Sequence, residues 1–385
     1  MTNSIIYADN SSTSFPKPDS VYEAMTGFYK NYGGNPGRSS HKLSATAYSK
    51  IGSVRSLVAA LFNSKSENVV FTLNATDALN IAIRGVLKQG DHVITSVLEH
   101  NSVNRPLNHL ERAGLINITR VEPSDETITF AQIAQHITPR TKLVAITHCS
   151  NVTGWVMPVE EIGYNLKAYY PNIVFLADCA QTAGAFDIDV EAMNMDILVF
   201  TAHKGLMGAM GVGGLVVSPD IEIEPLRVGG SGDDSRNPFH PENMPDRLEA
   251  GTPNIPGIVA LGAGIEFIMD TGIDAIRDKE ETLIVRLREK LAGRRNLRIF
   301  TSEKHGGASI LSFNIDGISP NDVASILDGE FGIATRPGLH CAPYCHRFLG
   351  TYPDGAVRIS LGFFNTMDEV DFIAESVNKI AESVK

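Results

Sequence analysis

The stretch Ile197-Leu198-Val199-Phe200-Thr201-Ala202-His203-Lys204-Gly205 places a lysine directly after an uninterrupted apolar run. Such a run is typical of a strand buried on both faces of a parallel sheet. An amine held at the end of that strand loses hydration, which lowers its pKa and suits it to form a Schiff base with a carbonyl compound. Lys204 therefore predicts both a fold class and a kind of chemistry.

A carboxylate ends the preceding apolar run, Ile173-Val174-Phe175-Leu176-Ala177-Asp178. A carboxylate beside a pyridine nitrogen keeps that nitrogen protonated, and the ring then withdraws electrons from a bound amino acid. Lys204 and Asp178, at the ends of two neighbouring strands, therefore indicate a site for pyridoxal 5'-phosphate.

The sequence around these runs predicts an α/β fold. Between about residues 68 and 217, short β-rich apolar runs alternate with helical stretches, which favours a mostly parallel mixed sheet flanked by helices. The predicted strands are 69–73, 92–96, 143–148, 173–178 and 197–201, with 213–218 as a further strand of either direction. Polar candidates follow five of them, at the edge where open α/β sheets bind ligands. They are Asn74-Ala75-Thr76, Glu99-His100, Asn151, Asp178 to Gln181, and His203-Lys204.

The length of 385 residues exceeds the usual size of one domain, so two domains are expected. A large cofactor-binding domain is predicted over residues 15–262. Residues 1–14 together with 263–385 are predicted to form a smaller α+β domain. Within it we expect helices at 255–269, 273–291, 322–327 and 368–384, the first crossing the boundary, and strands at 309–314, 333–336 and 356–361.

Composition excludes several classes of function. The net charge of −11 disfavours a general nucleic-acid or anionic-membrane surface. No signal-peptide pattern and no apolar segment long enough to span a bilayer is visible, so a cytoplasmic protein is expected.

The four cysteines do not resemble a secreted disulfide framework, and we interpret them as free thiols. Cys341 and Cys345 with His340 and His346 are the candidates for a zinc cluster. A C-x3-C spacing without a second cysteine pair is a weak metal pattern, so no metal is predicted.

Cys341 lies in a loop bounded by glycine and proline, with Arg336 and His340 nearby. Positive groups favour the thiolate, the form that attacks sulfur, although an incidental surface cysteine is the alternative. Further on, Arg358 interrupts an apolar strand, where a guanidinium can hold a carboxylate by two hydrogen bonds. The alternative is that Arg358 points into the protein and forms an ion pair there.

The segment Phe71-Thr72-Leu73-Asn74-Ala75-Thr76 reads as a strand that turns directly into a helix. The free N–H groups of a helix start favour a phosphate, and Thr76 can add a hydroxyl donor. Helix capping by Thr76 is the alternative. His100 can lie over a pyridine ring or serve as a structural hydrogen-bonder, and Asn151 and Gln181 can fix loops or donate to a ring oxygen.

Together these segments resemble the class V aminotransferase family, which has fold type I of the pyridoxal-phosphate enzymes, and within it the group II cysteine desulfurases. The resemblance spans nearly the whole chain. The motifs are Tyr7-Ala8-Asp9-Asn10, Asn35-Pro36-Gly37-Arg38, Ala75-Thr76-Asp77, Glu99-His100, His148-Cys149-Ser150-Asn151, Asp178-Cys179-Ala180-Gln181, His203-Lys204, Arg247 to Asn254, and Arg336 to Pro343.

The resemblance implies roles for individual residues. The cofactor would be held by Ala75, Thr76, His100, Asn151, Asp178, Gln181, Thr201, His203, Lys204 and Thr252. Catalysis would involve Lys204, Cys341 and His100, and substrate would be bound by Arg358, Arg336, Asn151 and His41. Because Thr252 would reach the phosphate of the neighbouring subunit, a homodimer with a composite active site is implied.

The implied reaction converts L-cysteine to L-alanine and leaves a persulfide on Cys341, which an acceptor protein would collect for iron–sulfur clusters or thio-cofactors. The short connection from Cys341 to Arg358 looks like that of group II. The chain departs from the family in Cys179, in the polar Asn10-Ser11-Ser12 and in the extra thiol Cys345.

These departures leave the substrate open. An L-selenocysteine lyase and another class V aminotransferase or lyase are alternatives. A cofactor-binding partner protein without catalysis is a further one, and the intact lysine, aspartate, arginine and cysteine speak against it.

Overall fold

The structure, a computed structural model, describes residues 5–36, 41–231, 236–301 and 307–384. Arg38 of the motif 35–38 lies outside these residues. The larger part of the chain forms a seven-stranded sheet in the order β2-β8-β7-β6-β5-β3-β4. Its strands are β2 Val69–Thr72, β3 Asp91–Ser96, β4 Ile116–Val121, β5 Thr141–Thr147, β6 Val174–Asp178, β7 Ile197–Thr201 and β8 Gly213–Val217.

Only β8 runs against the direction of the sheet. It pairs antiparallel with β2 and with β7, whereas the other neighbouring pairs are parallel. The carboxyl ends of β2, β3, β5, β6 and β7 therefore meet at one edge. This confirms the predicted mostly parallel mixed sheet and shows that the strand beginning at residue 213 is the antiparallel one.

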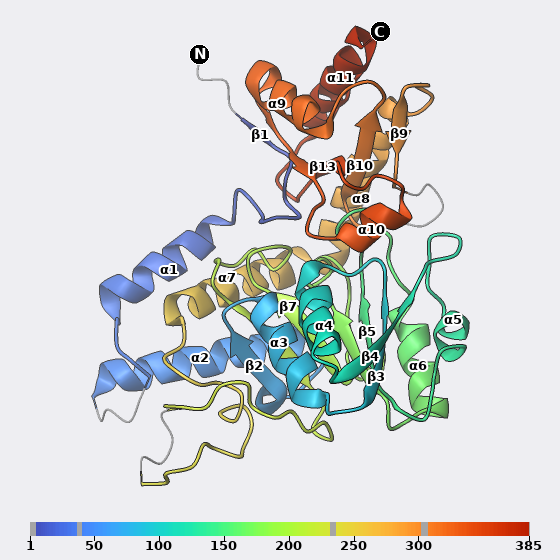
Figure 1. Cartoon of the computed structure of the whole chain (residues 1–385). Helices are drawn as coiled ribbons and strands as arrows, with labels where there is room; N and C mark the ends of the chain where they lie inside the picture. The colour runs from blue at the N-terminus through green and yellow to red at the C-terminus, as the bar shows by residue number, and fades with distance from the viewer. Residues whose placement is uncertain (1–4, 37–40, 232–235, 302–306, 385) are drawn as a thin grey trace.

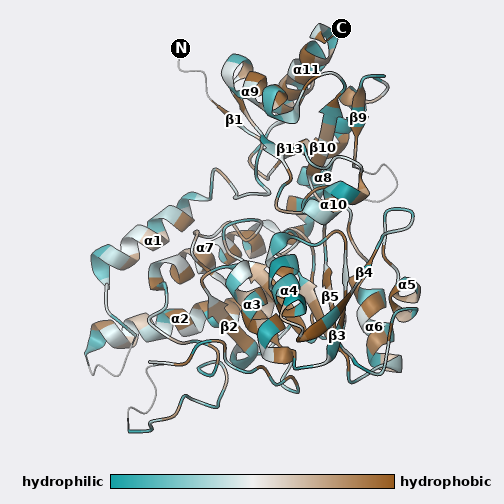
Figure 2. Cartoon of the chain, in the orientation of Figure 1, coloured by the Kyte–Doolittle hydropathy of each residue, from teal (hydrophilic) through white to brown (hydrophobic). Residues whose placement is uncertain are grey.

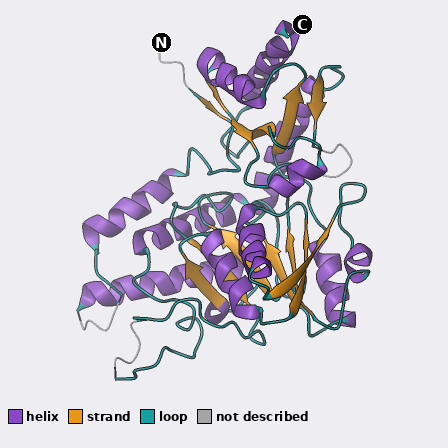
Figure 3. Cartoon of the chain, viewed as in Figure 1, coloured by secondary structure: helices purple, strands orange, loops and turns teal. Residues whose placement is uncertain are grey.

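Helices cover both faces of this sheet (Figure 3). They are α1 Asp19–Asn31, α2 Lys42–Leu61, α3 Ala75–Val86, α4 Asn101–Arg112, α5 Phe130–Ala134, α6 Val159–Tyr169 and α7 Ile255–Thr271. Alternate residues of β7 enter opposite cores: Leu198 and Phe200 pack on one face, and Ile197 and Val199 on the other. Strands β2, β6, β7 and β8 are buried along their whole length, and they are mostly apolar because both faces of the sheet are covered, as the hydropathy colouring shows (Figure 2).

The sequence pattern does not predict β4, which is the last strand at one edge of the sheet. Its partly exposed residues include Asn117, Thr119 and Arg120, so it carries no continuous apolar run. An edge strand with polar side chains is protected against pairing with other chains, and for the same reason it gives a weak hydrophobic signal.

The smaller part has its own antiparallel sheet in the order β12-β13-β10-β9, and lies above the large sheet in the view of Figure 1. Its strands are β9 Leu297–Ile299, β10 Ile310–Ile315, β12 Arg336–Gly338 and β13 Ala356–Ser360, and β1 Ile6–Tyr7 pairs in parallel with β11 Ile333–Ala334. Its helices are α8 Ile273–Leu291, α9 Pro320–Phe331, α10 Pro343–Phe348 and α11 Met367–Ser383.

Helix α8 connects the two parts. Its early residue Ile276 packs in the core beneath the large sheet, while Leu283 and Leu287 pack in the separate core of the small sheet. Residue 262, the predicted domain boundary, falls inside α7, which packs against α1 and α2. The division into residues 15–262 and 1–14 with 263–385 remains a proposal.

Candidate active site

A polar cavity of about 220 Å³ lies between the carboxyl edge of the large sheet and the smaller part of the chain. Twelve of the fourteen predicted site residues line it. They are Ala75, Thr76, His100, Asn151, Asp178, Gln181, Thr201, His203, Lys204, Arg336, Cys341 and Arg358. The first nine follow or end strands of the large sheet, and the last three come from the smaller part of the chain.

Lys204 lies one turn past the end of β7 and faces this cavity. Burial lowers the pKa of Lys204 to about 8; Asp178 opposes this, while Arg358 and Arg336 lower the pKa further. A neutral amine is the nucleophile that attacks an aldehyde, so the surroundings favour that form.

Asp178 ends β6 and is almost completely buried. Its Oδ1 accepts a hydrogen bond from the backbone N–H of Ala180 at 3.0 Å. Burial raises the pKa of Asp178, while that hydrogen bond and Lys204 lower it. A buried carboxylate of this kind is stabilised by a cation, and a protonated pyridine nitrogen would supply one.

One end of the cavity is formed by the start of α3. The N-cap of this helix is Asn74, whose side chain accepts from the N–H of Asp77 at 2.9 Å. The alternative of capping by Thr76 is therefore wrong: the Thr76 hydroxyl lies 2.7 Å from that of Ser102 in the cavity wall. The first amides of α3, including that of Ala75, have no preceding turn to bond to.

Two buried donors near this helix start have no hydrogen-bond partner, the hydroxyl of Thr201 and Nδ1 of His203. Orphaned buried polar atoms beside a helix N-terminus fit an anion such as a phosphate. Gly213 lets β8 pass close by, because a Cβ there would lie 2.5 Å from the backbone carbon of Asn74. With Asp178 placed for a pyridine nitrogen and Lys204 for an aldehyde, the residues fit pyridoxal 5'-phosphate.

His100 is the N-cap of α4, and its Nδ1 accepts from the N–H of Ser102 at 3.1 Å. The same nitrogen lies 2.9 Å from the Ser102 hydroxyl. Burial lowers the pKa of His100 to about 4, and the charges of Lys204 and Arg336 act in the same direction. The imidazole is therefore neutral near pH 7 and can lie against an aromatic ring without bringing a charge.

Arg336 and Arg358 face each other across the β12–β13 pair. Like charges in directly opposed positions repel. Asp9 offsets this repulsion: its Oδ1 accepts from Nη2 of Arg358 at 2.7 Å. Nη1 of Arg358 donates to the backbone carbonyl of Asn151 at 3.0 Å, and Ser12 accepts from both arginines.

The ion pair that was the alternative reading of Arg358 is therefore present. It does not use the whole guanidinium, because Nε of Arg358 is buried without a partner. The spare donor and the second cation, Arg336, leave a net positive charge for an anionic ligand.

Cys341 is half-buried and has a left-handed backbone, with φ 57°. Hydrogen bonds fix its loop: the N–H of Asn101 donates to the Cys341 carbonyl at 2.6 Å, and Nδ2 of Asn151 donates to the His340 carbonyl at 2.7 Å. Nη2 of Arg336 lies 3.7 Å from Sγ of Cys341. The loop thus presents its thiol to the cavity beside a guanidinium.

His340 contributes no positive charge to the thiol. Its Nε2 lies 2.9 Å from the carbonyl of Arg336, and its Nδ1 lies 3.3 Å from Nε2 of His346. Burial lowers the pKa of His340 well below its usual value. The positive surroundings expected from the sequence therefore come from the arginines.

The other three thiols are free and buried. Burial raises the pKa of Cys149 and of Cys345 to about 12, and it also raises the pKa of Cys179. Among the described residues, no group of three or more histidines, cysteines or acidic residues is arranged to hold a metal ion.

His41 and Thr252 do not line the cavity. His41 is exposed and caps α2 by accepting from the N–H of Ser44 at 3.2 Å. Thr252 lines another cavity of about 140 Å³, together with Arg55 and Arg227. Their roles in substrate and cofactor binding remain predictions that depend on a second subunit.

Asp9, Ser12 and Ser102 are site residues that the sequence prediction missed. Ser102 lies between Thr76 and His100, and Asp9 and Ser12 hold the arginines across about 350 positions of sequence. The polarity of Asn10-Ser11-Ser12 is the one signal for the second pair. No local pattern marks Ser102.

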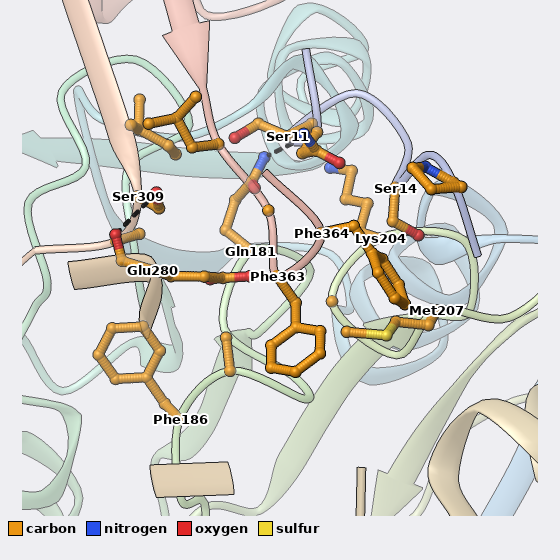
Figure 4. Close-up of a pocket in the computed structure, with 18 residues that line it drawn as sticks. Ser11, Ser14, Gln181, Phe186, Lys204, Met207, Glu280, Ser309, Phe363 and Phe364 are labelled. Atoms are coloured by element: carbon orange, nitrogen blue, oxygen red, sulfur yellow. Dashed lines mark hydrogen bonds between the residues drawn. The ribbon is translucent and has the colours of Figure 1, made fainter. Parts of the chain in front are cut away.

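A smaller cavity of about 60 Å³ adjoins the first, and Ser11, Gln181 and Lys204 line both. Nε2 of Gln181 donates to the backbone carbonyl of Ser11 at 3.3 Å, and Figure 4 shows this contact together with Lys204, Glu280 and Phe363, which also line the smaller cavity. Burial raises the pKa of Glu280 to about 8. The polar residues that fit the cofactor line the larger cavity.

Comparisons with known proteins agree with this geometry. The family model described as aminotransferase class-V matches residues 6–373. A "probable cysteine desulfurase" of Methanothermobacter thermautotrophicus is 35% identical over 98% of this chain and 94% of its own length. A "cysteine desulfurase" of Enterobacter sp. is 34% identical over 98% of this chain and 93% of its own.

Solved structures give the same result. The apo structure of a cysteine desulfurase from Thermococcus onnurineus NA1 has a TM-score of 0.91 and 34% identity, over 100% of this chain and 95% of that chain. The order of strands, the cavity and these similarities lead to one assignment. The chain belongs to the class-V aminotransferase family, whose members use pyridoxal 5'-phosphate.

Proposed function

We propose that this protein is a pyridoxal-phosphate-dependent cysteine desulfurase, which converts L-cysteine to L-alanine and carries the sulfur as a persulfide on Cys341. The observation that carries the proposal is that Lys204, Asp178, Arg358 and Cys341 line one cavity. The names of the similar proteins support the same reaction. The sulfur would supply iron–sulfur clusters or thio-cofactors.

The cofactor would be held at three points. Ala75, Thr76, Thr201 and His203 would bind its phosphate, and Asp178 would bond its pyridine nitrogen. His100 would lie on the ring, and Asn151 and Gln181 would reach its oxygen. When bound, pyridoxal 5'-phosphate supplies a carbonyl for the substrate amine and a ring that accepts electrons.

Residues of the chain position the substrate and move its protons. Arg358 would bind the cysteine carboxylate through its unpaired Nε, and Arg336 would add a second positive charge. Lys204, whose pKa is lowered to about 8, would accept the α-proton as a neutral amine. His100, neutral because its pKa is lowered to about 4, is available to exchange a second proton.

The thiolate of Cys341 would attack the sulfur atom of the substrate. The new S–S bond forms as the substrate C–S bond breaks, and the electron pair of that bond stays on carbon, which takes a proton to become the methyl group of alanine. The balance is L-cysteine plus enzyme thiol giving L-alanine plus enzyme persulfide. Nη2 of Arg336, 3.7 Å from Sγ, would orient the attacking sulfur.

The test compares two cysteine variants. Cys341→Ala should retain the cofactor absorption spectrum and lose persulfide-dependent sulfur transfer to dithiothreitol, with alanine formation reduced at least about a hundredfold, as is typical when a nucleophile is removed. Cys345→Ala is the matched control, because that thiol is buried and its pKa is raised to about 12. It should keep the parental rate. A Cys341→Ala protein that transfers sulfur at the parental rate would exclude the assignment.

L-selenocysteine remains the second candidate substrate, since the same carboxylate and amine contacts would bind it. A comparison of alanine release from L-cysteine and from L-selenocysteine with Cys341→Ala separates the two. A selenocysteine lyase would keep its turnover of L-selenocysteine without the thiol. A simple transaminase would form no alanine from L-cysteine, and a non-catalytic partner protein would turn over neither substrate.

We also propose a homodimer in which Thr252 reaches the cofactor phosphate of the neighbouring subunit. The support is its position in a separate cavity that also contains Arg55 and Arg227, away from Lys204. A cytoplasmic location and a protein that accepts the persulfide sulfur belong to the same proposal. No described helix is long and apolar enough to cross a membrane.

A further inference from the structure

A second surface feature adjoins the thiol loop on its outer side. A cavity of about 380 Å³ is lined by Arg105 of α4, by Tyr344 and Arg347 of α10, and by Tyr352, which follows α10. We call these four residues the arginine–tyrosine groove. Helices α4 and α10 lie next to each other in Figure 1, and Nδ2 of Asn108 in α4 donates to the hydroxyl of Tyr344 in α10 at 3.3 Å.

The loop that carries Cys341 separates this groove from the active-site cavity. Cys341 lines the inner cavity, whereas Leu339 and Pro343, two residues away on either side, line the outer groove. In the same way, His100 lines the inner cavity and Asn101 the outer groove. A molecule bound in the groove therefore contacts the outer side of the loop that carries the half-buried thiol.

The side chains of the groove are held in a stacked arrangement. The guanidinium of Arg120 lies 4.6 Å from the ring centre of Tyr344, and that of Arg347 lies 4.7 Å from the ring of Tyr352. Asn108 fixes Arg120 by accepting a hydrogen bond at 2.5 Å. Tyrosine and arginine are the residues enriched at the centres of protein interfaces, because they offer large contact area and directed hydrogen bonds.

The charge of the groove is opposite to that of the molecule. The chain carries a net charge of −11, yet the two arginines that line the groove, Arg105 and Arg347, have no carboxylate partner among the described residues. Arg55 and Arg227, by contrast, are paired with Glu249 and Asp77. An acidic partner would be repelled by most of this surface and attracted to the groove.

We propose that the arginine–tyrosine groove docks an acidic segment of the protein that accepts sulfur from Cys341. The inference rests on the proposed function. The acceptor thiolate attacks the outer sulfur of the persulfide, a new S–S bond forms on the acceptor, and the bond to Cys341 breaks with its electron pair left on the Cys341 thiolate. The sulfur atom changes carrier and no outside oxidant is needed.

The test measures transfer from the persulfide form, made by incubating the full-length holoenzyme with L-cysteine. The acceptors are two synthetic peptides, one with a cysteine flanked by aspartates and glutamates and one with a cysteine flanked by lysines, and neutral dithiothreitol. At low ionic strength the acidic peptide should react about tenfold faster than the basic one, the lower range of electrostatic steering. The advantage should shrink as added salt shortens the Debye length to about 10 Å at 0.1 M.

Exposed residues allow matched variants. The double variant Arg105→Glu with Arg347→Glu should reverse the preference, and Arg105→Gln with Arg347→Gln should remove it, while alanine formation with dithiothreitol stays unchanged. The control is Arg295→Glu with Lys379→Glu, which alters the net charge equally at exposed positions of the small domain. It should keep the preference for the acidic peptide.

Equal transfer rates to the two peptides at low ionic strength would overturn the docking proposal. So would a preference for the acidic peptide that persists when the charges of Arg105 and Arg347 are reversed. If the small anionic thiol mercaptosuccinate shows the same increase in transfer rate as the acidic peptide, the assignment of a protein segment as the ligand of the groove is overturned. Failure of the unchanged protein to form alanine and persulfide would instead defeat the proposed function, and the docking with it.

Discussion

At the scale of single residues, the site depends on charged groups held where water cannot solvate them fully. Lys204 and Lys17 illustrate the difference between burial and function. Burial lowers the pKa of each lysine to about 8. Nζ of Lys17 donates to Ser14 and to the carbonyl of His203, whereas Lys204 faces the polar cavity. The two lysines therefore have the same lowered pKa and different roles.

This comparison gives a pH-dependent prediction. A lysine with a pKa of about 8 is mostly protonated below pH 8, so the rate at which the apoprotein takes up pyridoxal 5'-phosphate should rise with pH and level off above about 8. Borohydride reduction and peptide mass mapping should place the pyridoxyl group on Lys204. Lys17→Arg should leave the profile unchanged, and Lys204→Arg should abolish fixation. A label on Lys17 would contradict the assignment.

Arg358 gives a second prediction at this scale. Arg358→Lys keeps a positive charge for Asp9 but loses the planar guanidinium and its unpaired Nε. Because a hydrogen bond to a charged group contributes about 1.5–3 kcal/mol, KM for L-cysteine should rise roughly ten- to hundredfold, with a smaller effect on kcat. Steady-state kinetics measure both. Arg286→Lys, in an exposed ion pair, is the control, and an unchanged KM in Arg358→Lys would argue against carboxylate binding there.

At the scale of elements, the close approach of β8 to the start of α3 shapes the phosphate end of the cavity. The Gly213→Ala change would bring a Cβ within 2.5 Å of the Asn74 backbone. We expect an overpacking loss of about 1–3 kcal/mol in the free energy of unfolding and weaker cofactor binding.

Gly52→Ala is the matched control for this change. Gly52 lies in α2 with nothing within 4 Å of the added Cβ, so alanine should be neutral or stabilise by up to about 1 kcal/mol. Denaturant unfolding and titration with pyridoxal 5'-phosphate measure both effects. A Gly213→Ala protein as stable as the parent, with the same cofactor affinity, would show that the close approach has no role.

The element scale also explains what the sequence could and could not predict. The strands that lead to Thr76 and Lys204, and the strand that ends at Asp178, were predictable because burial on both faces gives continuous apolar runs. Strand β4 was not, because it is a polar edge, and β9 has only three residues.

The sequence did not predict the long-range contacts either. The pairing of Asp9 with Arg358 and the register that opposes Arg336 to Arg358 depend on how distant segments pack, which no local pattern records. The loop around Cys341 was predictable from its glycine and prolines, while the short helix α10 that follows it was not.

At the scale of the whole molecule, buried neutral histidines link stability to pH. Burial lowers the pKa of His100, His148, His203 and His346 to about 4 in each case, and that of His340 well below its usual value. The unfolded chain takes up these protons near pH 6.5, whereas the folded chain does not until about pH 4. The free energy of unfolding should therefore fall as the pH drops from about 6.5 to about 4.

Buried acids act in the opposite direction, and their range overlaps that of the histidines between about pH 4.5 and 6.5. Burial raises the pKa of Glu99 and of Glu280 to about 8, so their stabilisation is present below about pH 4.5 and is lost as the pH rises to about 8. Because five histidines outnumber these two acids, the free energy of unfolding should decrease overall as the pH falls from 6.5 to 4. Urea unfolding at a series of pH values measures it, and a free energy of unfolding that rises steadily from pH 6.5 to pH 4 would contradict it.

Two parts of the chain meet at one cavity, and this is the central feature of the molecule: the part built on the large sheet holds the amine of Lys204, and the part built on the small sheet holds the thiol of Cys341. The most direct measurement is a single turnover of the holoenzyme with L-cysteine, followed by rapid alkylation, alanine analysis and peptide mass mapping. We predict one alanine for each sulfur atom gained, with that sulfur on the Cys341 peptide. Alanine formed without added sulfur on Cys341, or sulfur on another cysteine, would contradict this account.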